Sequence, residues 1–251
     1  MLRAYDDSFQ KYNIEDGYFQ TKKKLTPAQK EDIEKSDVKV YENFYIEQKL
    51  TNGSTIRFFK NRKEVDKVCL MNGKMPKKSG EIAVDRMYAD NNELKVGDTV
   101  KSRKKTFRIT GLVALSDYSA LFQNNNDTMF DAVKFGVAIV TDKDFEALNQ
   151  VKVQYNYAWI YDKKPATEKK EKKMAEDLME DMADVVTIES FVPQYQNQSI
   201  HFTGDDMGSD RAMIVMLFYI VMAILAFVFG ITISNTIRKE AGVIGTLRAS
   251  G

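Results

Sequence analysis

The sequence has little of the side-chain chemistry that most enzymes use. Its 251 residues include one cysteine, Cys69, and one histidine, His201. One cysteine excludes an intramolecular disulfide and any multi-cysteine zinc site, and one histidine excludes a metal centre with two histidine ligands. No G-x-x-x-x-G-K-[ST] phosphate loop and no G-x-S-x-G nucleophile motif occurs. We therefore expect the chain not to be an enzyme and to have no cofactor and no bound metal.

An excess of either charge is also absent. The chain has 37 Lys and Arg against 36 Asp and Glu, a formal net charge of +1. Domains that bind nucleic acid usually carry a strongly basic surface, so this balance predicts no nucleic-acid partner. The length is sufficient for one ordinary hydrophobic core or two small ones.

One long segment contains no charged residue. Residues 212–237 read AMIVMLFYIVMAILAFVFGITISNTI. As a helix they would be about 39 Å long at about 1.5 Å per residue, against a hydrocarbon core of about 30 Å. The alternative is a buried helix of a soluble domain, but such helices are usually shorter and keep a polar face. The segment therefore predicts a transmembrane helix in contact with the lipid bilayer.

The flanks of this segment predict its orientation, because cytoplasmic ends retain Lys and Arg. Basic residues follow the segment and mainly acidic residues precede it: Arg238, Lys239 and Arg248 after it, and Asp205, Asp206, Asp210 and Arg211 before it. We expect residues 1–211 outside the cytoplasm and the C-terminus inside. Since residues 1–25 hold no apolar stretch, we also expect an earlier transmembrane helix upstream and further chain beyond Gly251. Together with His201, the three aspartates could bind a hard cation, but their spacing matches no calcium loop and favours a linker.

Two stretches of the outer part each indicate strand, helix, strand. The first has a strand at 12–20, a helix that starts with Thr26 as N-cap and Pro27 as first residue, and an alternating strand at 38–50. The second has a strand at 153–161, a helix at about 167–183 and a strand at 185–193. That helix carries an apolar stripe, which we interpret as core contacts: Met174, Leu178 and Met182. The two halves are expected at about residues 9–62 and 132–203.

A turn-rich region lies between the halves, at about residues 63–131. Strands are expected near 64–70, 98–103, 106–114 and 135–140. Asn52-Gly53 predicts a type I′ hairpin turn, and Val96-Gly97-Asp98 predicts a second turn. The predicted fold class is therefore α+β, with two strand-helix-strand halves forming a porter-like (ferredoxin-like) layer, an inserted β-rich lobe and one following transmembrane helix. The polar loop 116–131 has no predicted role.

Two features near the C-terminus indicate partners. Ala226, Gly230 and Ser234 recur at i, i+4 and i+8 and form a narrow face for close packing of another transmembrane helix, although small residues are frequent in such segments. Past the span, IRKEAGVIGTLRASG predicts a short helix at the membrane surface, whose apolar residues Val243, Ile244 and Leu247 either contact a partner or rest on the headgroups.

This last segment resembles the one that follows the second transmembrane helix in FtsX-like (MacB-type) permeases of ABC transporters. The matching residues are Arg238, Lys239, Glu240, Gly242, Leu247, Arg248, Ala249 and Gly251, while Ala241 stands where that family usually has Ile. GEIAVDRMYADNNELKVGDTV (80–100) and FRITGLVALSDYSALF (107–122) are similar to the extracytoplasmic core domain of the same permeases, in the same order.

The resemblance implies a permease subunit of an ABC transporter, dimeric and packed against other transmembrane helices, with the ATPase on another chain or domain. It implies an extracytoplasmic domain at 1–205, a juxtamembrane and transmembrane helix at 206–237, and a cytoplasmic coupling segment at 238–251. The implied contacts with the ATPase are Arg238, Lys239, Glu240, Val243, Ile244, Leu247 and Arg248. Such permeases often transmit motion to the outer domain for export, peptide resistance or cell-envelope work. The alternative is a single-pass membrane-anchored receptor or sensor with an extracytoplasmic binding domain.

Overall fold

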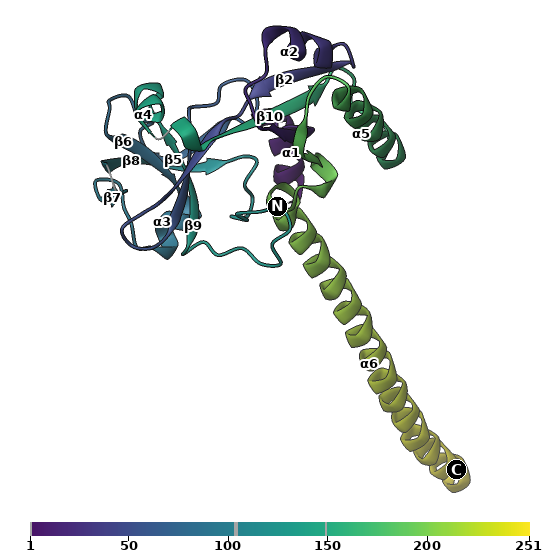
Figure 1. Cartoon of the computed structure of the whole chain (residues 1–251). Helices are drawn as coiled ribbons and strands as arrows, with labels where there is room; N and C mark the ends of the chain where they lie inside the picture. Colours follow the sequence, from purple (N-terminus) through teal and green to yellow (C-terminus); the bar gives the residue numbers. More distant parts are fainter. Residues whose placement is uncertain (1, 103–104, 149) are drawn as a thin grey trace. The chain divides into compact units, whose positions relative to one another are not determined.

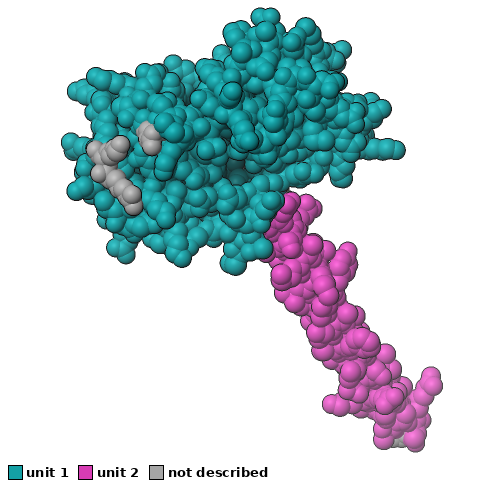
Figure 2. All heavy atoms as spheres, viewed as in Figure 1, with its two compact units in different colours: residues 1–203 teal, residues 204–251 magenta. Residues whose placement is uncertain are grey.

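The computed structural model describes residues 2–102, 105–148 and 150–251. It divides into two compact units, which meet between Thr203 and Gly204 (Figure 2). The first unit is a mixed α+β body, and the second is formed by the greater part of helix α6 (Gln198–Ser250) (Figure 1). The predicted α+β class is confirmed.

A small antiparallel layer forms one core of the first unit. Its strands lie in the order β11-β1-β10-β2, and helices α2 (Pro27–Glu34) and α5 (Glu168–Ala183) contribute to the same core. Ile33 of α2 and Leu178 of α5 pack against Trp159 and its strand neighbours. The four strands are β1 (Gly17–Thr21), β2 (Val38–Glu42), β10 (Val153–Tyr161) and β11 (Ile188–Pro193).

The local signals for both helices are confirmed. Thr26 caps α2 in a capping box with Gln29, and Pro27 is the first helical residue. The Thr167 hydroxyl accepts a hydrogen bond from the backbone N–H of Lys170 and so caps α5. Leu178 and Met182 are buried against the strands, as the apolar stripe predicts.

A larger, β-rich core fills the rest of the unit. Its sheet continues in the order β10-β3-β4-β9-β6-β8-β5, with β7 beside β8, and the β4–β9 and β6–β8 pairs are parallel. The long strand β10 joins the two cores, because its first residues pair with β3 and the others pair with β1 and β2. The elements are β3 (Tyr45–Lys49), β4 (Thr55–Phe59), β5 (Val68–Gly73), β6 (Glu81–Asp85), α3 (Arg86–Asn91), β7 (Thr99–Lys101), β8 (Thr106–Leu115), β9 (Phe135–Val140) and α4 (Asp142–Ala147), with single 3-10 turns at Gln150–Lys152 and Gln194–Gln196.

Several sequence predictions of secondary structure were wrong in detail. The N-terminal residues form a helix, α1 (Leu2–Tyr12), and the strand expected from residue 12 begins only at Gly17. The single strand expected at 38–50 is two strands, because the chain leaves β2 at Asn43 to bond with Asn156 and then enters β3. The strand β6 and the short helices α3 and α4 were not predicted.

The hairpin between β3 and β4 is confirmed, but its turn type was wrong. The backbone N–H of Gly53 donates to the carbonyl of Leu50 at 3.1 Å, and Leu50 N–H donates to Ser54 O at 2.8 Å. Gly53 has φ +88°, whereas Asn52 has a negative φ, so the two positive values of a type I′ turn are missing. The loop has three residues, and glycine takes the left-handed position at its end.

Helix α6 runs without interruption from Gln198 to Ser250. Gln198–Ala249 is long and apolar enough to cross a membrane, which agrees with the predicted span. The separate short helix expected after residue 237 is not found, since residues 238–250 continue the same helix. Residues 238–250, predicted as a separate helix at the membrane surface, are therefore the last turns of α6.

Candidate functional site

The residues predicted to contact an ATPase all lie on the last turns of α6. Val243, Ile244 and Leu247 are each more than half exposed, so three large apolar side chains face outward there. Gly230 lies between Ala226 and Ser234 on the predicted packing face, and apart from the adjacent residues and nearby backbone of its own helix no atom lies within 4 Å of the position that a Cβ would take on it. Both predicted sites are therefore open for contacts with other chains.

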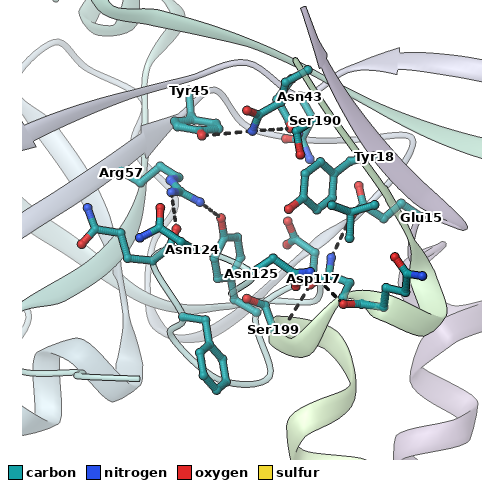
Figure 3. Close-up of a pocket in the computed structure, with 18 of the residues that line it drawn as sticks. Glu15, Tyr18, Asn43, Tyr45, Arg57, Asp117, Asn124, Asn125, Ser190 and Ser199 are labelled. Carbon is teal, nitrogen blue, oxygen red and sulfur yellow. Dashed lines mark hydrogen bonds between the residues drawn. The ribbon is translucent and has the colours of Figure 1, made fainter. Parts of the chain in front are cut away.

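The first unit contains a polar cavity that the sequence did not predict. Its volume is about 400 Å³. One wall is the face of the small layer opposite α2 and α5, another is the β3–β4 hairpin, and the loop 116–131 closes a third side (Figure 3).

Strand alternation explains why polar side chains line the first wall. Successive side chains of a strand point to opposite faces, so Phe19 of β1 packs into the helix-covered core while Tyr18 and Gln20 face the cavity. Gln20 pairs with Asn156 of β10 and with Ser190 of β11. Its Nε2 donates to the Asn156 Oδ1 at 3.1 Å and to the Tyr45 hydroxyl at 3.2 Å, which joins the two walls.

Arg57 of β4 lies in the second wall, and its charge is paired with the carboxylate of Glu47. Its guanidinium donates to the Glu47 carboxylate from two nitrogens, to the Tyr118 hydroxyl and to the carbonyl of Gln123. Its central carbon lies 4.1 Å from the centre of the Tyr45 ring. Arg57 thus fixes the loop at Tyr118 and Gln123 onto β4 and has no unpaired charge for a ligand.

A buried cluster of ionisable groups lies at the inner end of the cavity. Arg62 donates from both terminal nitrogens to the two oxygens of Asp117, at 2.7 and 2.6 Å, and from Nη1 to Asn43 Oδ1 at 3.2 Å. Asp66 accepts from the backbone N–H of Glu15 at 2.9 Å and from Asn43 Nδ2 at 3.2 Å. Three carboxyl groups, those of Glu15, Asp66 and Asp117, therefore share one buried guanidinium.

This excess of carboxyl groups determines their protonation. Burial, and next the neighbouring Asp66 and Asp117 carboxylates, raise the pKa of Glu15 well above its ordinary value. Burial and the Asp117 carboxylate also raise the pKa of Asp66, to about 7. The charged form of Glu15 is therefore disfavoured, and Asp117 is paired with Arg62.

The loop 116–131 is bonded to the first turn of α6. Asn125 Nδ2 donates to the carbonyl of Gln196 at 2.9 Å, and its Oδ1 accepts from the backbone N–H of Gln198 at 3.0 Å. The backbone N–H of Ser119 donates to the carbonyl of Ser199 at 2.7 Å. The loop whose role the sequence did not reveal thus lines the cavity and holds the start of the helix that continues into the apolar segment.

Sequence reasoning missed this site because its residues come from distant segments. Arg62 and Asp117 are 55 positions apart, and Glu15 and Asn197 are 182 apart. The one available signal was the run of amides at 123–126, Gln-Asn-Asn-Asn, within the polar loop 116–131. Within the described residues, no group of three or more His, Cys, Asp or Glu side chains could hold a metal ion.

Similar folds occur among solved structures. No family model matches the sequence, and no curated protein matches it. The chain is similar to the extracellular domain of the noncanonical ABC-type transporter YknZ from Gram-positive bacteria, with 12% identity and a TM-score of 0.37 over 70% of this chain and 97% of that one. It is also similar to the periplasmic region of MacB from Actinobacillus actinomycetemcomitans, with 14% identity and a TM-score of 0.35 over 69% of this chain and 87% of that one. The function proposed below rests on this chain's own residues.

Proposed function

We propose that the chain is part of the permease subunit of an ABC transporter. Residues 1–205 form its extracytoplasmic domain, residues 206–237 its juxtamembrane and transmembrane segment, and residues 238–251 the start of a cytoplasmic segment that contacts an ATPase. The permease is dimeric and packs further transmembrane helices against the face formed by Ala226, Gly230 and Ser234.

One observation carries this proposal. A folded α+β unit continues through helix α6 into an apolar segment without charged residues, 212–237. Arg238 and Lys239 follow this segment directly. This order, together with the motifs at 80–122 and 238–251, is what the resemblance to FtsX-like permeases requires. The basic end supports a cytoplasmic C-terminus.

The small layer supports the finer part of the fold assignment. Its order β11-β1-β10-β2 is antiparallel throughout, and each half contributes a helix to the same core. In chain order this is strand, helix, strand, repeated once, with the last strand beside the first. We assign this layer as ferredoxin-like and porter-like.

The apolar residues of the last turns provide the proposed contact with the ATPase. Burial of one side chain such as Leu247 is worth about 1.5–3 kcal/mol, and a charge in its place adds a desolvation cost. A loss of this size weakens an interface about tenfold or more. Motion driven by ATP would then pass through α6 to the outer domain.

Co-purification of the ATPase with the full-length permease tests the proposal. Leu247→Asp is expected to lose most of the ATPase, while membrane insertion is unchanged. Ala249→Asp is the control, because position 249 lies two residues beyond Leu247 on a different face of the helix, and this variant is expected to retain the ATPase. Undiminished recovery with Leu247→Asp would refute the contact. Failure of the unchanged protein to bind any ATPase would favour the single-pass receptor or sensor.

A further inference from the structure

We propose that the cavity between the small layer and the β3–β4 hairpin binds a neutral saccharide of one or two sugar units. This goes beyond the role of the permease in coupling to an ATPase, since it assigns a ligand class to the outer domain. Figure 3 shows the side chains that converge on the cavity from three sides.

Size and enclosure are the first argument. A volume of about 400 Å³ lies at the lower end of the range for small-molecule sites, which is about 300–1,000 Å³. A folded protein, a helix or a long peptide does not fit such a space. The ligand is therefore small, and the walls contact it from several directions.

Charge is the second argument. Among the described residues, Arg57 is the only Lys or Arg that lines the cavity, and four of its N–H groups already donate to Glu47, Tyr118 and Gln123. Asp117 is paired with Arg62, and burial together with the neighbouring carboxylates raises the pKa of Glu15, which disfavours its charged form. An anion would meet a guanidinium that is already paired with Glu47, and a cation would meet the Asp117 carboxylate that is already paired with Arg62, so the lining favours an uncharged ligand.

Unused hydrogen-bonding groups are the third argument. In the described part of the chain, the Tyr18 hydroxyl, the Asn156 Nδ2 and the Ser190 hydroxyl have no partner in the protein, although all three residues line the cavity. Amides and hydroxyls of this kind offer a donor beside an acceptor, which matches the paired hydroxyl groups of a sugar. The half-buried ring of Tyr18 adds an apolar surface on which the C–H face of a sugar ring can rest.

A ligand in this cavity would also influence the start of α6, because cavity residues are bonded to that helix. The importance of this influence for transport rests on the proposed function. Asn125 lines the cavity and is bonded to both Gln196 and Gln198 at the start of that helix. Phe122 also lines it, and its ring packs edge-on against Phe202, with 5.5 Å between ring centres. A bound saccharide therefore stabilises the loop in the arrangement that holds the first turn of α6.

The test is calorimetric titration of the full chain in nanodiscs with two neutral disaccharides, diacetylchitobiose and maltose, and with the tripeptide Ala-Ala-Ala. We expect at least one disaccharide to bind. Tyr18→Phe and Asn156→Ala each remove one hydrogen bond and should weaken binding by roughly 3- to 10-fold, and Tyr18→Ala should weaken it further.

Tyr41→Phe and Asn91→Ala are the matched controls, because these residues lie outside the cavity lining and the changes are chemically the same. Thermal unfolding of each variant verifies that the fold is retained. The proposal is overturned if neither disaccharide binds, if the tripeptide binds in their place, or if the Tyr18 and Asn156 variants bind as well as the controls. None of these outcomes bears on recovery of the ATPase with Leu247→Asp, so this proposal and the proposed function fail separately.

Discussion

Arg62 and Asp117 form a two-fold hydrogen-bonded ion pair, with N–O distances of 2.7 and 2.6 Å and side chains that are 5% and 7% exposed. The pair joins the chain after β4 to the chain after β8, so it closes the larger core next to the cavity. Because Asp66 and Glu15 lie beside the pair, the charge of Arg62 also lowers the pKa of these two buried carboxyl groups and opposes the effect of burial.

Removal of this cation should be strongly destabilising. Arg62→Met leaves Asp117 buried without its ionic partner, and we expect it to lower the free energy of unfolding by about 3–5 kcal/mol. Arg86→Met is the control, because Arg86 pairs with Asp90 at an exposed site and should cost less than about 1 kcal/mol. Urea unfolding followed by the fluorescence of Trp159 measures both. Equal losses for the two variants would contradict the importance of burial.

The carboxyl cluster should make stability depend on pH. Burial raises the pKa of Asp66 to about 7, while in the unfolded chain it is near 4. Between these values the folded state binds more protons than the unfolded state, so stability decreases as pH rises, by up to about 1.4 kcal/mol per pH unit for one such group.

Asp66→Asn removes this titration and keeps the shape of the side chain. Its unfolding free energy, measured in urea from pH 4 to pH 7, should therefore show a flatter profile than that of the unchanged protein. The exposed Asp32→Asn serves as control and should leave the slope as it is. A parallel profile for Asp66→Asn would show that Asp66 is ionised throughout this range.

Gly17 should not tolerate a side chain. The indole of Trp159 lies over its Cα, and a Cβ there would overlap the ring and lie 2.8 Å from the carbonyl oxygen of Val192. Overpacking of this kind costs about 1–3 kcal/mol, and we expect Gly17→Ala to lower the unfolding free energy of the first unit accordingly. Gly208→Ala, at a position with no atom within 4 Å of the added Cβ, should leave it unchanged. A Gly17→Ala protein as stable as the Gly208→Ala protein would mean that Trp159 can move aside.

The orientation in the membrane is testable by cysteine labelling in intact cells. Cys69 is partly exposed and is first replaced by serine. Met129, 82% exposed on the loop 116–131, and Ala249 at the end of α6 are then changed singly to cysteine in the full-length protein. A membrane-impermeant maleimide should react at position 129, and at position 249 only after permeabilisation. The opposite pattern would place the C-terminus outside and remove the basis of the proposed function.

Elements with local signals were predictable from the sequence. The bounds of β10 and α5 follow from an alternating run and from Thr167, whose hydroxyl must satisfy the free N–H groups of the first turn. The span follows from the absence of charge in residues 212–237. Such signals act within a few residues, so they need no knowledge of the fold.

Elements held by distant partners were not predictable. Helix α1 has no apolar run in its sequence, and its packing depends on Tyr5 and Phe9 meeting Ile200 and His201. The strand is interrupted at Asn43 because the backbone N–H of Asn43 bonds to the carbonyl of Asn156, far along the chain. The carboxyl cluster likewise forms only where four separate segments of the folded chain come together. The cavity is the result of these same contacts, which is why an amide-rich loop indicated nothing about function until the fold was known.

The bond between α1 and the first turn of α6 has a consequence for the modularity of the outer domain. The Tyr5 hydroxyl donates to the carbonyl of Ile200 at 2.9 Å, so the chain enters and leaves the first unit at the same place (Figure 1). Units whose two ends lie side by side can be inserted into a host chain without disturbing its own fold. We therefore expect the first unit to tolerate insertion between two helices of a host protein with its own fold retained.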